Sequence, residues 1–141
     1  MSLEENKAIV RGLTEAENER NYALFDEFLA PDFVSIVSDG TPPYGREIYK
    51  QGSKTLFKDI IPDFHGTIED IIAEGDKVWI RYKATGTHKG KKVTMNSFGI
   101  YRIVDSKVVE MRSFIDTGWN KVLGVIEYTE KGKKLFPEDA K

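Results

Sequence analysis

The sequence predicts an α+β fold in which N-terminal helices pack against a curved antiparallel sheet. Apolar residues recur at helical spacing up to about residue 61 and at alternate positions after Pro62. The runs after Pro62 are separated by short turns, as in hairpins. Helices gathered first and strands gathered last favour an antiparallel sheet over βαβ units. The chain has 141 residues and no Gly/Ser or Pro tract, so we expect one domain over residues 1–141.

Three helices are expected in the first half. The first, from residue 3 to about residue 21, has an apolar stripe of Leu3, Val10, Leu13 and Ala16, with Glu4, Glu5, Glu15, Glu17 and Glu19 off the stripe. The second covers residues 22–29 and ends before Pro31, which disfavours a helical residue before it. A short strand over 33–37 and a turn-rich segment lead to the third helix, 46–61, which Pro62 stops.

The second half predicts two long hairpins. Residues 67–73 pair with 77–86, and residues 93–104 pair with 108–115. Long antiparallel strands twist and curl, and a sheet that bends around a helix forms a cone with a concave apolar face. A cone that is open at one end is a pocket, so we expect a small hydrophobic ligand as a partner.

Composition and motifs exclude several functions. The net charge is −2 and the isoelectric point is near 5.8, so no nucleic acid partner is expected. No stretch approaches a membrane span, no membrane partner is expected, and a cytoplasmic location is the default expectation. The chain has no cysteine and only two histidines, His65 and His88, so we expect no metal site. His88 lies beside lysines in what we interpret as a solvated hairpin loop.

A family resemblance rests on several segments in order. They are residues 24–34, residues 45–49, residues 62–86 with their Pro-Asp-Phe-His and Ile-Glu-Asp-Ile-Ile-Ala-Glu-Gly-Asp runs, and residues 106–124. In order and spacing they resemble the SnoaL-like polyketide cyclases, a branch of the nuclear transport factor two-like superfamily. The resemblance implies a cone-shaped core over about residues 5–124 and a homodimer. Residues 125–141 extend beyond the family's usual end, and we expect them to form a C-terminal extension.

Asp116 is the first catalytic candidate. It follows the last expected strand, on the alternating set with Glu110, Arg112 and Phe114. The resemblance implies that Asp116 is the general acid/base, which apolar neighbours such as Phe114 would desolvate if this set faces the cone. The alternative is a structural role, in which Asp116 caps residues 117–120 through an Asx turn.

His65 is the second catalytic candidate. The resemblance implies that it is the histidine of the family's Pro-Asp-x-His segment, where an imidazole can hydrogen-bond an enolate oxygen or shuttle a proton. The alternative is that His65 fixes the backbone of the turn. The expected substrate-binding residues are Arg112, Phe114, Trp79, Tyr101 and Trp119, although most aromatic residues at these periods fill a core.

The resemblance implies a cyclase or isomerase that needs no cofactor and acts on a small hydrophobic carbonyl compound by general acid/base catalysis. In that chemistry a carboxylate removes an acidic proton and donors in the pocket stabilise the enolate. The architecture also hosts other functions, so two alternatives stay open. One is a non-catalytic module that binds a small molecule or serves as an accessory protein, and the other is a structural dimer whose cone is packed shut.

Overall fold

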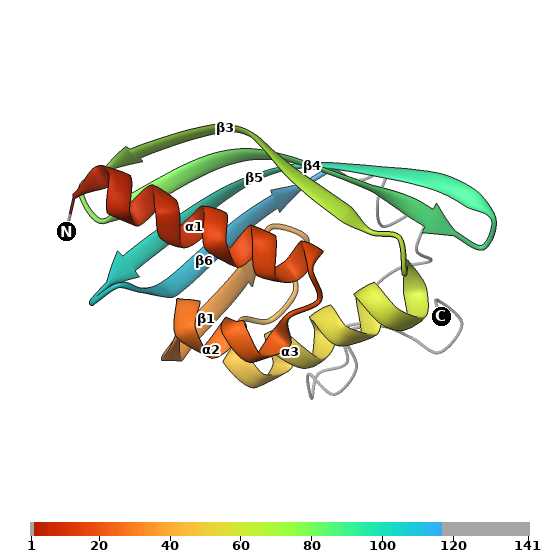
Figure 1. Cartoon of the computed structure of the whole chain (residues 1–141), viewed down its shortest axis with the longest axis horizontal. Coiled ribbons are helices and arrows are strands. Elements are labelled where there is room, and N and C mark those ends of the chain that lie inside the picture. The colour runs from red at the N-terminus through yellow and green to blue at the C-terminus, as the bar shows by residue number, and fades with distance from the viewer. Residues whose placement is uncertain (1, 117–141) are drawn as a thin grey trace.

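The helices of the computed structural model, which describes residues 2–116, all lie in the first half of the chain, as expected (Figure 1). They are α1 (Leu3–Asn18), α2 (Phe25–Phe28) after a 3-10 turn at Tyr22–Leu24, and α3 (Arg46–Thr55), which continues into a π-helical turn at Leu56–Ile60. Helix α1 begins with a capping box. The hydroxyl of Ser2 accepts the backbone N–H of Glu5, and the carboxylate of Glu5 accepts the backbone N–H of Ser2.

The strands form one six-stranded, curved and unclosed sheet, which confirms the α+β fold and both predicted hairpins. They are β1 (Leu29–Val37), β2 (Tyr44–Gly45), β3 (His65–Glu74), β4 (Lys77–His88), β5 (Lys91–Val104) and β6 (Lys107–Ile115). Their order is β2-β1-β6-β5-β4-β3. All neighbours are antiparallel except β1 and β6, which run parallel, so the expectation of a purely antiparallel sheet was wrong at this pair.

Strand β1 begins earlier than the sequence indicated, directly after α2. Its pairing with β6 shifts register between Leu29 and Val34. Pro31 lies in this irregular stretch. It has no backbone N–H to donate, and in this stretch the pairing of the two strands does not need one. Proline therefore marks an irregularity within the strand instead of a boundary outside it.

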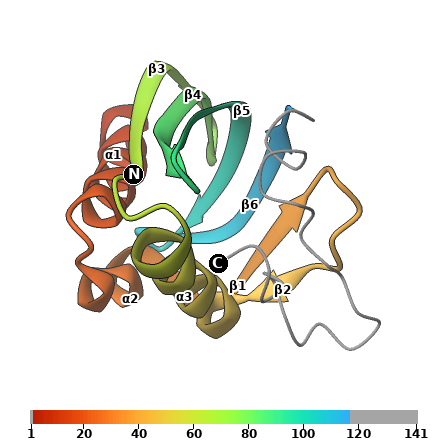
Figure 2. The same ribbon diagram turned by 90° about the vertical axis from the view of Figure 1, so that its right-hand side faces the viewer.

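The core lies between the helices and the concave face of the sheet, which curves around α1 and α3 (Figure 2). Its largest fully buried side chains include Phe25, Phe33, Leu13, Leu29 and Ile61. Along β4 the buried set runs through every second residue from Val78 to His88. His88 is thus buried at the end of the strand, which corrects its assignment to a solvated loop.

A bulge in β6 determines which side chains face the core. Ile103 pairs with Val108 and Arg102 pairs with Glu110, so Val109 is an extra residue in β6. Side chains alternate between the two faces of a strand, and one extra residue moves every later side chain to the other face. After Val109 it is the odd-numbered positions of β6 that face inward.

Candidate functional site

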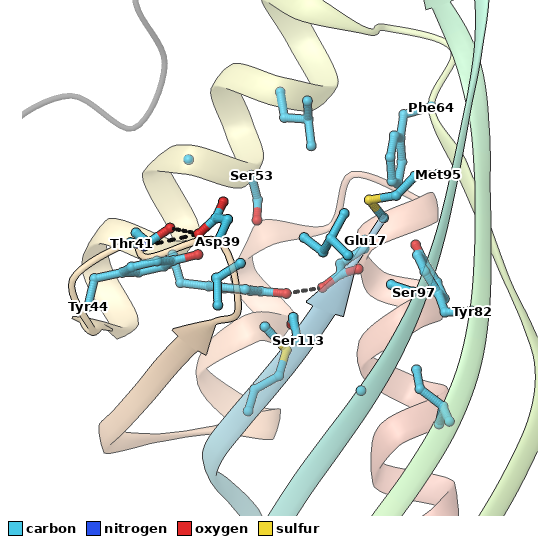
Figure 3. A pocket seen from close by; sticks show the side chains of 18 of the residues that line it. Glu17, Asp39, Thr41, Tyr44, Ser53, Phe64, Tyr82, Met95, Ser97 and Ser113 are labelled. Atoms are coloured by element: carbon cyan, nitrogen blue, oxygen red, sulfur yellow. Dashed lines mark hydrogen bonds between the residues drawn. The ribbon is translucent and has the colours of Figure 1, made fainter. Parts of the chain in front are cut away.

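A cavity of about 180 Å³ lies between the concave face of the sheet and the helices (Figure 3). Side chains from α1, α3, β1, β4, β5, β6 and the segment before β2 line it. Most of this lining is apolar or aromatic, and a few polar groups converge on the interior, as in small-molecule sites.

Glu17 brings a carboxyl group into the cavity from the last turn of α1. The side chain points toward the sheet, and the hydroxyl of Tyr49 on α3 donates a hydrogen bond of 2.5 Å to its Oε1 (Figure 3). Glu17 as a residue is only partly accessible, and it belongs to the lining of the cavity. The carboxyl group is therefore within reach of a ligand there while it is shielded from bulk water.

The backbone around Glu17 is held by its neighbours in sequence. Asn18 accepts the backbone N–H of Gly66 at 2.8 Å and donates to the carbonyl of Gly66 at 2.9 Å. Arg20 donates to the carbonyls of Pro62 and Phe64 at 2.7 and 2.8 Å. These bonds attach the end of α1 to the start of β3, and they fix the position from which Glu17 enters the cavity.

Burial raises the pKa of Glu17 from 4.5 to about 7, and the hydrogen bond from Tyr49 opposes part of this rise. Glu17 is also the second-last residue of α1, where the partial negative charge of a helix C-terminus disfavours a carboxylate. A carboxyl group with this pKa is populated in both protonation states near neutral pH. It can therefore accept or donate a proton, as a general acid/base requires.

Three tyrosines surround this carboxyl group. Burial raises the pKa values of Tyr49, Tyr82 and Tyr101, and the charge of Glu17 raises each of them further. All three hydroxyls consequently stay protonated at neutral pH and can donate hydrogen bonds. A Cβ at Gly66 would lie 1.6 Å from the hydroxyl of Tyr82, so the close approach of β3 and β4 requires glycine there.

A second polar group lies where the chain passes from β1 to β2. Asp39 accepts hydrogen bonds from the backbone N–H of Thr41, at 3.0 Å, and from the hydroxyl of Thr41 (Figure 3). Both residues line the cavity together with Tyr44. The described lining thus contains two carboxyl groups, at Glu17 and Asp39.

The face of β6 that lines the cavity is not the face that the sequence predicted. The residues of this strand that line the cavity are Met111, Ser113 and Ile115, whereas Arg112 and Phe114 are exposed on the other face. The bulge at Val109 is the physical reason for the difference. Arg112 forms an ion pair with Glu110 at 2.7 Å on that outer face.

Asp116 does not line the cavity. It is exposed just beyond β6, and its Oδ2 lies 3.4 Å from both the backbone N–H and the side-chain amide of Asn96, which donate to it. The Asx turn considered for Asp116 involves residues 117–120, which lie outside the described residues. Its catalytic role stays a prediction.

The other expected site residues are scattered. Tyr101 is buried and lines the cavity, Trp79 is exposed on the outer face of β4, and His65 is exposed at the first residue of β3. Trp119 and the predicted extension over 125–141 lie outside the described residues. Of the expected residues that the structure describes, only Tyr101 contributes to the cavity.

Glu17 was missed because the sequence analysis placed it off the apolar stripe. That placement was wrong. Glu17 lies four residues after Leu13 and seven after Val10, and both intervals keep a residue on the same helix face. An acidic residue at this spacing, on a stripe of buried residues, is a signal that could have identified it.

Nothing within residues 2–116 resembles a metal centre, since no group of three or more histidine, aspartate or glutamate side chains is placed to hold an ion. In the same part of the chain, no helix has the length and apolar composition needed to cross a bilayer.

The curved sheet, the helices on its concave side and the acid within the cavity define a small α+β protein with a pocket for an organic ligand. Residues 7–118 match the SnoaL-like polyketide cyclase family, which covers most of the chain. The chain belongs to this family. No curated protein matches the sequence significantly.

Solved structures of similar proteins agree with this assignment. AclR from Streptomyces galilaeus is 26% identical with a TM-score of 0.76, and the match covers 87% of this chain and 98% of AclR. IdmH from Streptomyces antibioticus, named as a polyketide cyclase, is 27% identical with a TM-score of 0.72, covering 85% of this chain and 99% of IdmH. An LEH-like epoxide hydrolase from M. tuberculosis shares the fold at 17% identity and a TM-score of 0.71, covering 81% of this chain and 84% of the hydrolase.

Proposed function

We propose that this protein is a cyclase or isomerase that needs no cofactor and acts on a small hydrophobic carbonyl compound. The observation that supports it most is Glu17, a carboxyl group in an apolar cavity whose pKa is raised to about 7. A base with a pKa near the working pH combines a useful ionised fraction with a strong driving force for proton transfer. The membership of the family agrees with this chemistry.

In the proposed mechanism the ionised Glu17 removes a proton from a carbon next to a carbonyl group. The electron pair of that C–H bond moves to the carbonyl and gives an enolate. The hydroxyls of Tyr82 and Tyr101 stay protonated and are candidates to donate to the enolate oxygen, which would stabilise its charge. The enolate carbon then attacks a second carbonyl of the same molecule, and the protonated Glu17 gives its proton to the alkoxide that forms. In an isomerisation Glu17 returns the proton to another position of the enolate instead.

The resemblance gives the acid/base role to Asp116 instead, with His65 as a second catalytic candidate. Both are exposed, and neither lines the cavity that contains Glu17. We therefore assign the proton transfer to Glu17 and keep Asp116 as the competing prediction, which variants of the two acids can distinguish.

Exchange of a carbon-bound proton for deuterium tests the proposal. The protein is incubated in D2O with 2-tetralone and with 1-phenylbutane-1,3-dione, and loss of the C–H signal is followed by NMR. We expect exchange at least about a hundredfold faster than with an equal concentration of acetate. The rate should rise with pH up to about 7 and then level, because only the ionised form of Glu17 accepts a proton.

A non-catalytic module that binds a small molecule is the second candidate. One observation favours it, namely that Asp116 and His65 do not line the cavity. This candidate predicts that both ketones raise the melting temperature of the protein without any acceleration of exchange. That combination would contradict the proposed catalysis.

A homodimer is also proposed, through the outer face of the sheet. Trp79, Phe98 and Phe114 are 45%, 57% and 49% exposed there. They lie on three adjacent strands. Phe98 is opposite Phe114 of β6 and opposite Arg81 of β4, and Arg81 is two residues from Trp79. Contiguous exposed aromatic side chains of this kind mark interaction surfaces.

The same outer face carries charges of both signs. Arg81 pairs with Glu69 and Asp70, and Arg112 pairs with Glu110. A twofold dimer places one patch against its own copy, and charges of both signs make such a patch compatible with itself.

Light scattering during gel filtration tests the dimer. We expect a mass twice that of the 16.0 kDa chain, and a Phe98→Lys variant should shift toward the monomer because it buries a charge between the two sheets. Thr94→Lys, on the exposed side of the same strand, is the control for the added charge. A monomeric wild-type protein at tens of micromolar would refute the dimer.

A further inference from the structure

The charged side chains that line the cavity in the described part of the chain are all acidic. Among residues 2–116, the charged or titratable side chains that line it are Glu17, Asp39 and tyrosines, with no lysine, arginine or histidine. Among the described residues, an anionic ligand would meet two carboxyl groups and no cationic side chain in a site of low dielectric, which is unfavourable. A cationic ligand would be attracted by the carboxylate of Glu17.

The cavity wall is also rich in aromatic rings. They are Tyr44, Tyr49, Phe57, Phe64, Tyr82 and Tyr101. A cation over the face of such a ring is attracted by the negative charge of the π system, and the attraction is strongest where water is excluded. One ring of this wall already takes part in such a contact, since the guanidinium of Arg20 lies 4.9 Å from the centre of Phe57.

Two cations of the segments that carry Glu17 and Tyr49 have other partners. Arg20 does not line the cavity, and its guanidinium donates to the carbonyls of Glu17, Asn18, Pro62 and Phe64. Lys50 pairs with Asp26 at 3.0 Å. Neither neutralises the carboxyl group of Glu17, whose hydrogen-bond partner is the uncharged hydroxyl of Tyr49.

We infer that the cavity takes an organic cation, an apolar skeleton that carries an ammonium group, with the ammonium placed at Glu17 and the skeleton among the aromatic rings. This inference goes beyond the proposed function and concerns a ligand of the same cavity. With its ammonium at Glu17, that ligand occupies the position at which the base would otherwise reach a C–H bond.

Proton linkage gives the inference a measurable signature. A cation prefers the ionised form of Glu17, so below pH 7 its binding releases the proton of that carboxyl group to the buffer. The titratable groups that face Glu17 are Tyr49 of α3, Tyr82 of β4 and Tyr101 of β5, and burial raises the pKa of each tyrosine above its ordinary value. The guanidinium of Arg20 lies close by, on the segment that follows α1. From β6 the uncharged Met111 and Ser113 reach the cavity.

Three para-substituted phenols of different charge, the first two of the same shape, test the inference by calorimetry between pH 5.5 and 7.5. They are (4-hydroxyphenyl)trimethylammonium, its neutral counterpart 4-tert-butylphenol, and the anion 4-hydroxybenzoate. At pH 7.5 we expect the cation to bind at least about tenfold more tightly than the neutral probe, and the anion to bind more weakly than both. Below pH 7 the affinity for the cation should fall by up to roughly tenfold per pH unit, while that for the neutral probe stays constant.

Glu17→Gln should remove both the preference for the cation and its pH dependence. Glu15→Gln, an exposed acid on the same helix, should keep both. Equal or tighter binding of the neutral probe, or tightest binding of the anion, would overturn the inference. These binding measurements need no turnover, so the two proposals can fail separately. Tighter binding of the cation without ketone exchange would refute the catalytic proposal alone. Ketone exchange without tighter binding of the cation would refute this inference alone.

Discussion

Glu17→Gln is expected to lower the rate of ketone exchange by about a hundredfold or more. Glutamine has nearly the same shape, and its carbonyl can still accept the hydrogen bond from Tyr49, but it cannot take up a proton. The variant should therefore keep the cavity while losing the base. The measurement is kcat/KM for exchange of 2-tetralone at pH 7.

Two further variants make this result specific. Glu15→Gln removes an exposed acid two residues away and should exchange at the wild-type rate. Asp116→Asn tests the competing prediction. A loss of exchange in Asp116→Asn together with normal exchange in Glu17→Gln would transfer the base to Asp116 and refute the assignment made here.

The same substitution is expected to change the pH dependence of stability. The pKa of Glu17 rises from 4.5 in an unperturbed state to about 7 in the folded protein, so between these values the folded state holds a proton that the unfolded state has released. The free energy of unfolding then falls by about 1.4 kcal/mol per pH unit, or roughly 3 kcal/mol over the whole interval. This contribution is fully present below pH 4.5 and is lost above pH 7.

Urea unfolding of the wild type and of Glu17→Gln at pH 5, 6, 7 and 8 measures this effect. Subtracting the two free energies of unfolding cancels the contributions of titratable groups that both proteins contain. Asp26 and Asp63 are such groups, and their hydrogen-bond partners lower their pKa values. We expect the free energy of unfolding of the variant, relative to that of the wild type, to increase steadily up to pH 7. Parallel curves would mean that Glu17 titrates as an ordinary exposed acid.

Most of the fold could be predicted from hydrophobic periodicity, because long elements repeat their pattern several times. The first helix and both hairpins depend on such repeats. The parallel pairing of β1 with β6 has no comparable local signal, since it joins segments about 75 residues apart along the chain, such as Ser35 and Met111. The two-residue strand at Tyr44–Gly45 is too short to show any period.

The site was harder to predict than the fold, for two physical reasons. The bulge at Val109 exchanges the two faces of β6, and a sequence with apolar residues at both Val108 and Met111 does not reveal where the exchange occurs. Glu17 looked like one more residue of an acidic helix surface. Its spacing from Val10 and Leu13 was informative, yet burial of an acid runs against the usual preference for water.

The attachment of α1 to the start of β3 has a consequence for how such a protein can diversify. Asn18 and Arg20 bind main-chain atoms of Pro62, Phe64 and Gly66, and at 62 and 64 the atoms concerned are carbonyl oxygens that any amino acid supplies. Side chains at those two positions can therefore be exchanged without releasing the end of the helix. Evolution, or an engineer, can reshape the ligand chamber from that side while the proton-transferring group keeps its place.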